Sequence, residues 1–389
     1  MRMSYRTVEI AWIPRKHTEW HTFTASRQEA ARLWGDLVVR HHRLRCLAWK
    51  WPSKGRWEKW ARRKYPGLSA QSCQQIIGEF CEAVDSTRQL RKNGHSAAAY
   101  PWRTPRYHDV VYTNQDARIR EGYLHLPNGA SGTVRIRMPD TITLPGRLME
   151  VRLSYGRVRL VCAVPDAPRP AHTVIGVDLG VNTLVAATDG QTVVLVNGRQ
   201  VKAIVQYRNK QLASLTQKQA PMTKGSRRWK RLQRRKHAML DTTQRKVRDA
   251  CHKATHIVTE AFPGATCYVG EPFNDAAQKM GRKQAQQVSQ ACTRTIINQL
   301  DYKTSGAITV NEAYSSQTCP VCGERSKHQR TYRCPKCQAT GPRDAVGSVN
   351  ILSRGVHGVM LPGRAIPAQV KYRRLYRRSS GGHPGNSSA

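Results

Sequence analysis

Two closely spaced pairs of cysteines constrain this chain more than any other feature. Each pair is a C-x-x-C motif, Cys319–Cys322 and Cys334–Cys337, and eleven residues separate the two motifs. Four thiolates at this spacing can surround one tetrahedral zinc ion from two adjacent hairpins. Two redox dithiols or a chance cluster are the alternatives, but redox dithiols usually begin a helix of a thioredoxin-like unit, and this segment has no such pattern. We therefore predict one structural zinc site with no open position for catalysis.

The other seven cysteines are scattered along the chain, so we expect them to be ordinary thiols in a reducing compartment. The sequence has no apolar run of the roughly 18 residues that a membrane helix needs. Its first residues, MRMSYRTVEI, lack the apolar core of a signal peptide. We expect a soluble, intracellular protein.

The charge balance points to a nucleic-acid partner. Lys and Arg together number 65 against 25 Asp and Glu, which gives a formal net charge of +40. Arginine outnumbers lysine by more than two to one, and its guanidinium binds phosphate in a bidentate manner and stacks on bases. A basic protein of a membrane surface would need an amphipathic anchor, which we do not find, so nucleic acid is the favoured partner.

Two regions concentrate the basic residues. In residues 49–64, tryptophans alternate with cations, a combination that can stack on bases while binding phosphates. The alternative is that at least half of these tryptophans form the core of a small helical domain. Residues 224–248 hold eleven Lys or Arg and one acid, and here the alternative is a solvated helix face. The predicted nucleic-acid contacts are Trp57, Lys59, Arg62, Arg63, Arg227, Arg228, Arg231, Arg234 and Arg235.

Local patterns predict the secondary structure. Ser26 and Glu29 have the spacing of a helix capping box, and an apolar helical repeat follows them. Between residues 107 and 166, short alternating runs separated by turn residues predict a meander or a small β-barrel. Later apolar runs predict strands at Val174–Leu179, Thr183–Thr188, Thr192–Val196, Thr266–Gly270 and Ala307–Val310.

Three carboxylates lie at the ends or in the middle of these elements. Asp178 is in the middle of the strand VIGVDL, where a charge is costly unless a cation or a hydrogen bond compensates it. Glu271 ends a later apolar strand, and Asp344 begins a helix. Taken singly, each has an ordinary explanation: a hydrogen-bonded aspartate, a solvated glutamate and a helix cap.

The order of these features resembles one protein family. Asp178 on the first strand of a meander, Glu271 on a later strand, the paired cysteines and then Asp344 at a helix start are similar to the RuvC-type nucleases of the transposon-encoded TnpB (OrfB) proteins, relatives of compact type V CRISPR effectors. The matching text is GVDLGVNTLVA, YVGEPF, LDYKTSG, AYSSQTCPVCG, YRCPKC and PRDAVGSVNIL. The resemblance is specific over residues 174–352, and before residue 165 it rests on domain order alone.

The third motif departs from the family pattern D-R-D-x-N-A-A-x-N. Pro342 replaces its first Asp, and residues 346–348 read Val-Gly-Ser instead of Asn-Ala-Ala. Asp344 and Asn350 are kept, so the metal ligand is retained while the packing of this helix can differ.

The resemblance implies a multidomain α+β fold. A small β-barrel with an inserted helical lobe precedes a RuvC/RNase H-like α/β nuclease domain, which a zinc ribbon interrupts. The implied boundaries are 1–20 and 105–168 for the wedge-like barrel, 21–104 for the helical recognition lobe, 169–310 and 343–368 for the nuclease domain, 311–342 for the zinc ribbon, and 369–389 for a basic, disordered tail.

The resemblance also implies the activity. Asp178, Glu271 and Asp344 would bind two Mg²⁺ or Mn²⁺ ions, in addition to the one structural zinc, and hydrolyse phosphodiester bonds of DNA next to a short flanking motif. The partners would be a guide RNA and double-stranded target DNA, with no membrane and no small-molecule cofactor. The protein would act in the prokaryotic cytoplasm, associated with the nucleoid when bound to DNA. The alternatives are a guided or unguided nucleic-acid-binding protein without cleavage, or a small CRISPR type V effector.

Overall fold

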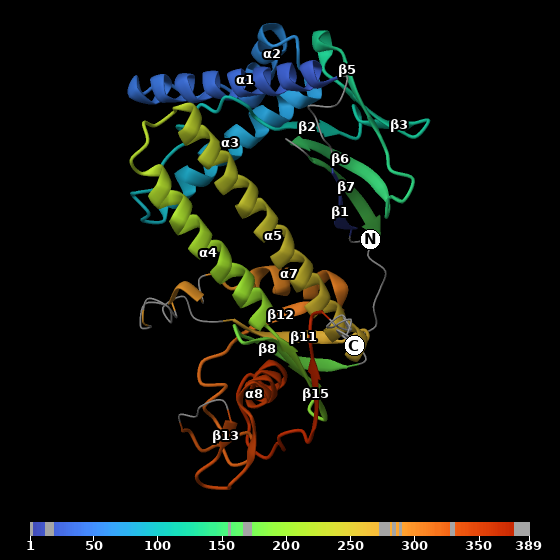
Figure 1. Ribbon diagram of the computed structural model, residues 1–389, viewed down its shortest axis with the longest axis vertical. Coiled ribbons are helices and arrows are strands. Elements are labelled where there is room, and N and C mark those ends of the chain that lie inside the picture. Colours follow the sequence, from blue (N-terminus) through green and yellow to red (C-terminus); the bar gives the residue numbers. More distant parts are fainter. Residues whose placement is uncertain are drawn as a thin grey trace, which may run out of the picture. The chain divides into compact units, whose positions relative to one another are not determined.

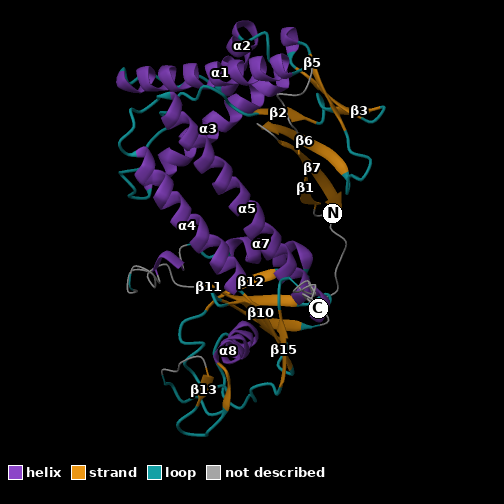
Figure 2. Cartoon of the chain, in the orientation of Figure 1, coloured by secondary structure: helices purple, strands orange, loops and turns teal. Residues whose placement is uncertain are grey.

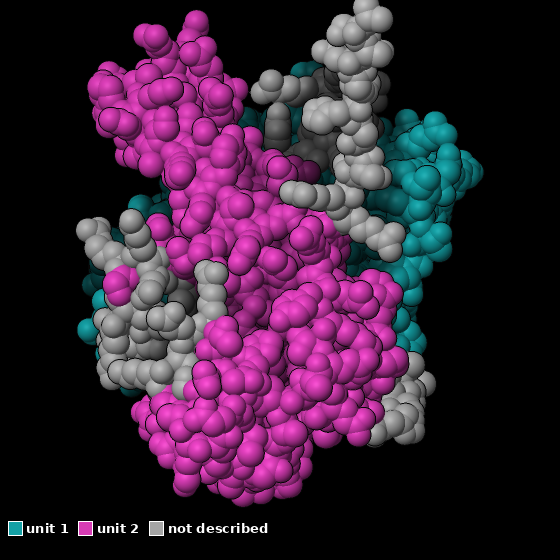
Figure 3. Space-filling model, turned by 60° about the horizontal axis from the view of Figure 1, so that its bottom comes forward, with its two compact units in different colours: residues 1–167 teal, residues 168–389 magenta. Residues whose placement is uncertain are grey.

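The computed structural model describes residues 3–11, 19–154, 157–165, 173–271, 281, 285–287, 290–326 and 331–376. The chain forms two compact units, residues 1–167 and 168–389 (Figure 3). Both α-helices and β-sheets occur in each unit, so the fold is of the mixed α+β class (Figure 2). Among the described residues, no helix combines the length and the apolar character of a membrane span.

The strands of the first unit form two open sheets. One sheet has the antiparallel order β1-β7-β6-β2, and the other has the order β3-β4-β5. The predicted closed barrel is not found among the described residues, because β1 and β2 lie at opposite edges of their sheet instead of pairing with each other. The strands and the short 3₁₀ turn are β1 (Met3–Ala11), β2 (Val110–Thr113), β3 (Arg118–Arg120), β4 (Tyr123–Pro127), η2 (Gly129–Ser131), β5 (Thr133–Arg137), β6 (Arg147–Ser154) and β7 (Arg157–Pro165).

In the described part of the first unit, three α-helices accompany these strands: α1 (Trp20–Cys46), α2 (Lys54–Lys64) and α3 (Ala70–Lys92) (Figure 1). The predicted capping box at Ser26 is wrong, because α1 begins six residues earlier and Ser26 is buried inside it. Ser26 Oγ donates to the carbonyl of Thr22, and Glu29 accepts from the backbone N–H of Gly67. Both side chains therefore make their hydrogen bonds from within the helix and do not cap its start.

The second unit is built on a six-stranded mixed sheet of order β12-β11-β8-β9-β10-β15. The meander β8-β9-β10 is antiparallel, β11 and β12 run parallel to β8, and β15 runs parallel to β10. The strands are β8 (Val174–Leu179), β9 (Thr183–Thr188), β10 (Thr192–Asn197), β11 (Thr266–Glu271), β12 (Ala307–Asn311) and β15 (Gln369–Arg373).

Helices cover the two faces of this sheet. Helices α5 (Arg227–Ala261) and α7 (Thr293–Lys303) pack on one face through an apolar cluster that includes Val177 and Val269. Helix α8 (Arg343–His357) lies on the other face (Figure 1). Helix α4 (Arg199–Gln219) runs beside α5, and the short strands β13 (Thr331–Arg333) and β14 (Thr340–Pro342) pair with each other just before α8.

The segment predicted as a disordered tail begins with regular structure. Residues 369–373 form β15, whose backbone pairs with the otherwise open edge of β10, and Leu375 is buried in the core beyond it. Sheet hydrogen bonds and one apolar anchor outweigh the basic, polar composition from which disorder was predicted. Residues 377–389 of the predicted tail lie outside the described residues.

Candidate functional site

The four paired cysteines converge on one point. The ligand atoms of Cys319, Cys322, Cys334 and Cys337 all lie within 4.8 Å of one another. The Sγ atoms of Cys319 and Cys337 are 3.5 Å apart, as are those of Cys322 and Cys334. Tetrahedral zinc with bonds of about 2.3 Å requires sulfur separations of about 3.8 Å, so the arrangement suits such an ion.

Both C-x-x-C motifs use the same backbone turn. In the first motif the Cys319 N–H donates to Glu324, and in the second the Cys334 N–H donates to Ala339. The residue after each motif, Gly323 or Gln338, has a positive φ of 78° or 58°. This turn directs backbone N–H groups toward the thiols and is therefore suited to stabilising thiolates.

The cysteine segment packs against α8. Cys319, Tyr332 and Cys334 share a buried cluster with Val346 of α8. Asn350 of α8 donates from Nδ2 to the carbonyl oxygens of Ser315 and Thr318, both at 2.7 Å. The cysteine segment therefore helps to set where α8 begins, and Asp344 is the second residue of that helix.

Helix α8 lies directly on β8, and Asp178 points into this contact. A Cβ atom on Gly176 would be 2.6 Å from Cβ of Leu352, and a Cβ on Gly347 would be 2.5 Å from Oδ2 of Asp178. Only glycine at these two positions leaves room for the helix and for the carboxylate. Gly347, against which Asp178 packs, is therefore one of the three residues that replace Asn-Ala-Ala in the third motif.

Asp178 shares its surroundings with two other carboxylates. Burial, together with the charges of Glu312 and Asp344, raises the pKa of Asp178 to about 8, although the Arg343 guanidinium and a backbone N–H act in the opposite direction. The structure therefore brings Asp178 and Asp344, predicted from sequence, into one electrostatic group with Glu312, which we did not predict.

Glu271 is placed differently from Asp178 and Asp344. Val177 pairs with Val269 in register, so Gly270 is level with Asp178 and Glu271 alternates to the opposite face. Its side chain is 47% exposed, and its Oε1 atom is 3.5 Å from Nη1 of Arg294 at the start of α7. In this conformation Glu271 is therefore held by a cation and is not in contact with Asp178.

Glu312 directly follows β12 and faces α8. A Cβ on Gly270 would be 3.1 Å from its Oε2 atom, and burial raises the pKa of Glu312 to about 6. The sequence contained a signal for it, namely a carboxylate just after an apolar strand, as at Glu271. We missed it because the residues after β12 were assigned to the zinc ribbon.

A polar groove of about 610 Å³ adjoins Asp344. Four arginines line it. Three of them lie outside α8: Arg373 ends β15, Arg374 directly follows it, and Arg199 begins α4. Tyr372 is 71% exposed beside them. Within the described part of the chain, these three arginines form no ion pair, so their charges are free for an anionic ligand. The four arginines are Arg199, Arg343, Arg373 and Arg374.

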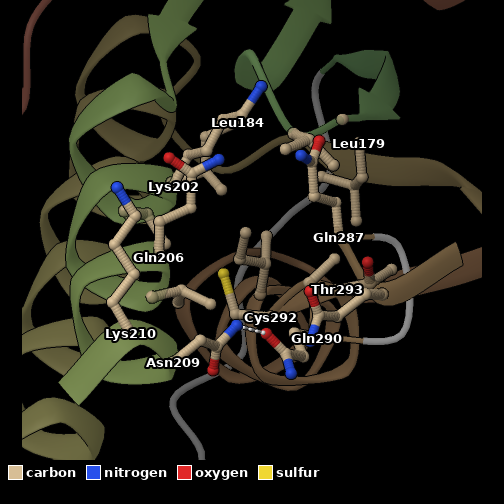
Figure 4. A pocket seen from close by; sticks show the side chains of 17 residues that line it. Leu179, Leu184, Lys202, Gln206, Asn209, Lys210, Gln287, Gln290, Cys292 and Thr293 are labelled. Atoms are coloured by element: carbon tan, nitrogen blue, oxygen red, sulfur yellow. Dashed lines mark hydrogen bonds between the residues drawn. The ribbon is translucent and has the colours of Figure 1, made fainter. Parts of the chain in front are cut away.

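A second cavity, of about 410 Å³, lies beside Leu179 (Figure 4). Aliphatic side chains and amides from α4 and from the residues before α7 line it. Asn209 Nδ2 donates to Oε1 of Gln290 at 2.8 Å across one side of this cavity. Leu179 belongs to the core on the α5 and α7 face, whereas Asp178 faces α8, so this cavity lies on the other side of the sheet from Asp178.

Trp57 does not contribute to a nucleic-acid surface in this structure. It is 5% exposed and packs against Trp51 and Trp60, with ring centroids 5.0 Å and 5.3 Å away. The prediction of a stacking contact at Trp57 is therefore wrong for this conformation, because α2 turns this residue into the helical core. The other three predicted residues of α2 are exposed: Lys59, Arg62 and Arg63.

The predicted basic residues of α5 form an exposed surface. None of the five takes part in an ion pair among the described residues. Gln219 of α4 donates from Nε2 to the carbonyl of Trp229, and Lys236 donates to Oε1 of Gln219, so the two helices are tied together behind this surface. The five residues are Arg227, Arg228, Arg231, Arg234 and Arg235.

Asp178→Asn is expected to stabilise the protein when no Mg²⁺ or Mn²⁺ is added. Folding raises the pKa of Asp178 from 3.8 to about 8, so between these values the folded state binds a proton that the unfolded state releases. Stability therefore falls as pH rises from about 4 to about 8, and asparagine removes this loss. We expect a gain of about 2–4 kcal/mol at pH 8 and little gain at pH 4, which urea unfolding measures. Equal stability of the two proteins at pH 8 would contradict this prediction.

Two family models match this chain. The OrfB_IS605 family, described as "Probable transposase", matches residues 158–264, and the family "Cas12f1-like, TNB domain" matches residues 294–351. Curated relatives include "TnpB-like protein MJ1635" of Methanocaldococcus jannaschii, which is 29% identical over 131 residues, or 33% of this chain. They also include "Putative RNA-guided DNA endonuclease InsQ" of Escherichia coli, 23% identical over 344 residues, or 82% of this chain. The resemblance to the TnpB (OrfB) family is confirmed.

The extent of the match to TnpB-like proteins differs between relatives. The chain spans 31% of the length of the archaeal relative and 81% of InsQ. The InsQ alignment is longer than everything after residue 165, so the TnpB-like similarity extends into the first unit. A solved structure, "Cryo-EM structure of the Cas12f1-sgRNA-target DNA complex", matches with a TM-score of 0.55 and 10% identity. The match covers 86% of this chain and 83% of the chain in that structure, which shows a shared mixed α+β fold.

Proposed function

We propose that this chain is an RNA-guided DNA endonuclease of a mobile element, cutting DNA next to a short flanking motif. The observation that carries the proposal is the convergence of Asp178 and Asp344 at the contact between β8 and α8. Two features support a divalent cation there: a buried carboxylate oxygen of Glu312 without a partner among the described residues, and a cradle that a Cβ on Gly347 would fill. Oxygen donors of this kind suit Mg²⁺ or Mn²⁺.

In the proposed mechanism, Asp178, Glu271 and Asp344 hold two such ions. When bound, the metals supply a hydroxide nucleophile and stabilise the leaving oxygen. Glu271 would join the site by releasing Arg294 and binding a metal ion in its place. This exchange is feasible because Asp178 and Glu271 lie at the same end of the neighbouring parallel strands β8 and β11. The site would cut the displaced strand and the target strand in turn. These residues belong to a RuvC-like nuclease domain at 169–310 and 343–368.

The protein's own arginines would position the DNA strand. Arg199, Arg373 and Arg374 line the groove beside Asp344 and form no ion pair among the described residues. Guanidinium groups of this kind bind backbone phosphates. The exposed arginines of α5 would bind guide RNA or the guide–target heteroduplex, which a protein of this kind recognises by shape and backbone. Both contacts would place the scissile phosphate relative to the carboxylates.

The four cysteines would hold one zinc ion in a ribbon at residues 311–342. Four thiolates leave no open position, so the ion would organise the segment that packs on α8. A nucleic-acid-binding protein without cleavage is the less favoured candidate, because buried carboxylates are costly and serve no purpose in binding DNA.

Sequencing of the bound RNA tests the guided function. The protein is expressed with its native flanking DNA in a prokaryotic host and purified, and the RNA that accompanies it is sequenced. We expect one abundant transcript with a defined end, encoded beside or overlapping the gene, whose terminal segment names the DNA target. A random sample of cellular RNA would argue against a guide and would favour an unguided nuclease or a nucleic-acid-binding protein.

A further inference from the structure

We propose that Glu312 is an additional ligand of the divalent-cation site formed by Asp178 and Asp344. This inference rests on the proposed function and extends it to a carboxylate outside the three motifs. Each of the three residues belongs to a different element: β8, the turn after β12, and the start of α8.

Strand register brings Glu312 to the same face as Asp178. Glu271 pairs with Asn311 in the parallel β11–β12 ladder, so Glu312 leaves the sheet one residue beyond the end of β11. Gly270, the residue of β11 level with Asp178, has no side chain, and a Cβ there would be 3.1 Å from Oε2 of Glu312. The carboxylate of Glu312 therefore occupies the space above Gly270, on the side that faces α8.

The backbone around Glu312 is held in place, while one oxygen of its carboxylate has no partner among the described residues. Arg354 of α8 donates from Nη1 to the carbonyl oxygens of Asn311 and Ala313, the residues on either side of Glu312. This arginine thus neutralises no carboxylate there. Oε2 of Glu312 is buried and has no hydrogen-bond partner among the described residues.

A buried, unpartnered carboxylate oxygen costs free energy unless a cation approaches it. Glu312 and Asp178 lie on the same face of the sheet, beneath α8. Like charges in a low-dielectric site repel each other, and a divalent cation between them reverses the sign of that interaction. Among described residues, Glu271 has Arg294 to compensate its charge, whereas Glu312 has no ion pair.

The affinity of the protein for Mn²⁺ tests this inference directly. The purified, zinc-loaded full-length protein is titrated with Mn²⁺, and free Mn²⁺ is followed by electron paramagnetic resonance. We expect Glu312→Gln to weaken the tightest Mn²⁺ site by about 10-fold or more. Glu260→Gln, which removes an exposed carboxylate of α5, is the matched control and should bind like wild type.

Two further variants make the outcome decisive. Asp178→Asn should weaken Mn²⁺ binding at least as much as Glu312→Gln does. Glu312→Asp keeps the negative charge on a shorter side chain, so its Mn²⁺ affinity should lie between those of Glu312→Gln and wild type. Wild-type affinity in Glu312→Gln together with weak binding in Asp178→Asn would overturn the role of Glu312 and leave the proposed nuclease site standing. Wild-type affinity in both variants would overturn the site itself.

Melting temperatures with and without Mn²⁺ distinguish a carboxylate that binds the metal from one that only supports the fold. Because Glu312→Gln removes a buried charge without changing shape, its melting temperature without added Mn²⁺ should equal or exceed that of wild type. Its melting temperature should rise less than that of wild type when Mn²⁺ is added. A Glu312→Gln protein that melts lower without Mn²⁺, and gains as much from Mn²⁺ as wild type, would show a structural role and overturn the inference.

Discussion

Asp178→Ala is expected to abolish Mg²⁺-dependent DNA cleavage, with a loss of about 10³-fold or more in rate. The side chain of Asp178 lies against Gly347 of α8, on the face of β8 that this helix covers. Without Asp178, the proposed site loses one of its carboxylate ligands. Cleavage of a plasmid carrying the guide's target measures the rate, under single-turnover conditions.

Binding separates this effect from loss of folding. RNA and DNA binding in gel-shift assays should stay nearly unchanged in Asp178→Ala, because the predicted nucleic-acid contacts lie on other elements. Glu271→Ala should lose cleavage in the same way if Glu271 exchanges Arg294 for a metal ion on substrate binding. Cleavage at the wild-type rate in either variant would remove that residue from the proposed site. Glu260→Ala, in an exposed position on α5, is the control.

Cys334→Ser is expected to lower the melting temperature and to abolish cleavage together. Cys334 is buried with Tyr332 and with Val346 of α8, so loss of the metal loosens the start of the helix that carries Asp344. A structural zinc site contributes several kcal/mol or more to folding. Each kcal/mol shifts the melting temperature of a domain of this size by about 2–4 °C, so we expect a fall of roughly 10 °C.

The zinc content of the same preparations checks the cause. Wild type should contain one zinc per chain by elemental analysis, and Cys334→Ser should contain much less. Cys46→Ser is the matched control, because Cys46 is exposed and lies outside the cluster. Wild-type stability in Cys334→Ser, or wild-type protein without zinc, would contradict a structural zinc site.

The strands that were predicted most accurately are those whose limits are set by neighbouring residues. The ranges expected for β8 and β9 agree with the structure, and β10 and β11 each extend one residue farther. Turn residues such as Asp189 and Gly190 end these strands locally, since the Asp189 carboxylate accepts from the N–H groups of Gln191 and Thr192. Such signals depend on only a few neighbouring residues.

Residues with more than one possible role were assigned less well. Trp57 has the same aromatic and cationic neighbours in sequence whether it stacks on a base or packs in a core, and the contacts of α2 with the rest of its unit decide between them. Ser26 is in a similar position, because a hydroxyl can cap a helix or bond back to the preceding turn.

Four features are evident from the order of amino acids alone: the paired cysteines, the acidic residues at strand and helix ends, the excess of positive charge and the similarity to one protein family. Each of these depends on residue identity and spacing along the chain. Which carboxylates share a face of the sheet, in contrast, depends on the fold. Register between β8, β11 and β12 places Glu312 with Asp178 and turns Glu271 toward Arg294. That register depends on how separate strands pair, and a shift of one residue moves a side chain to the other face.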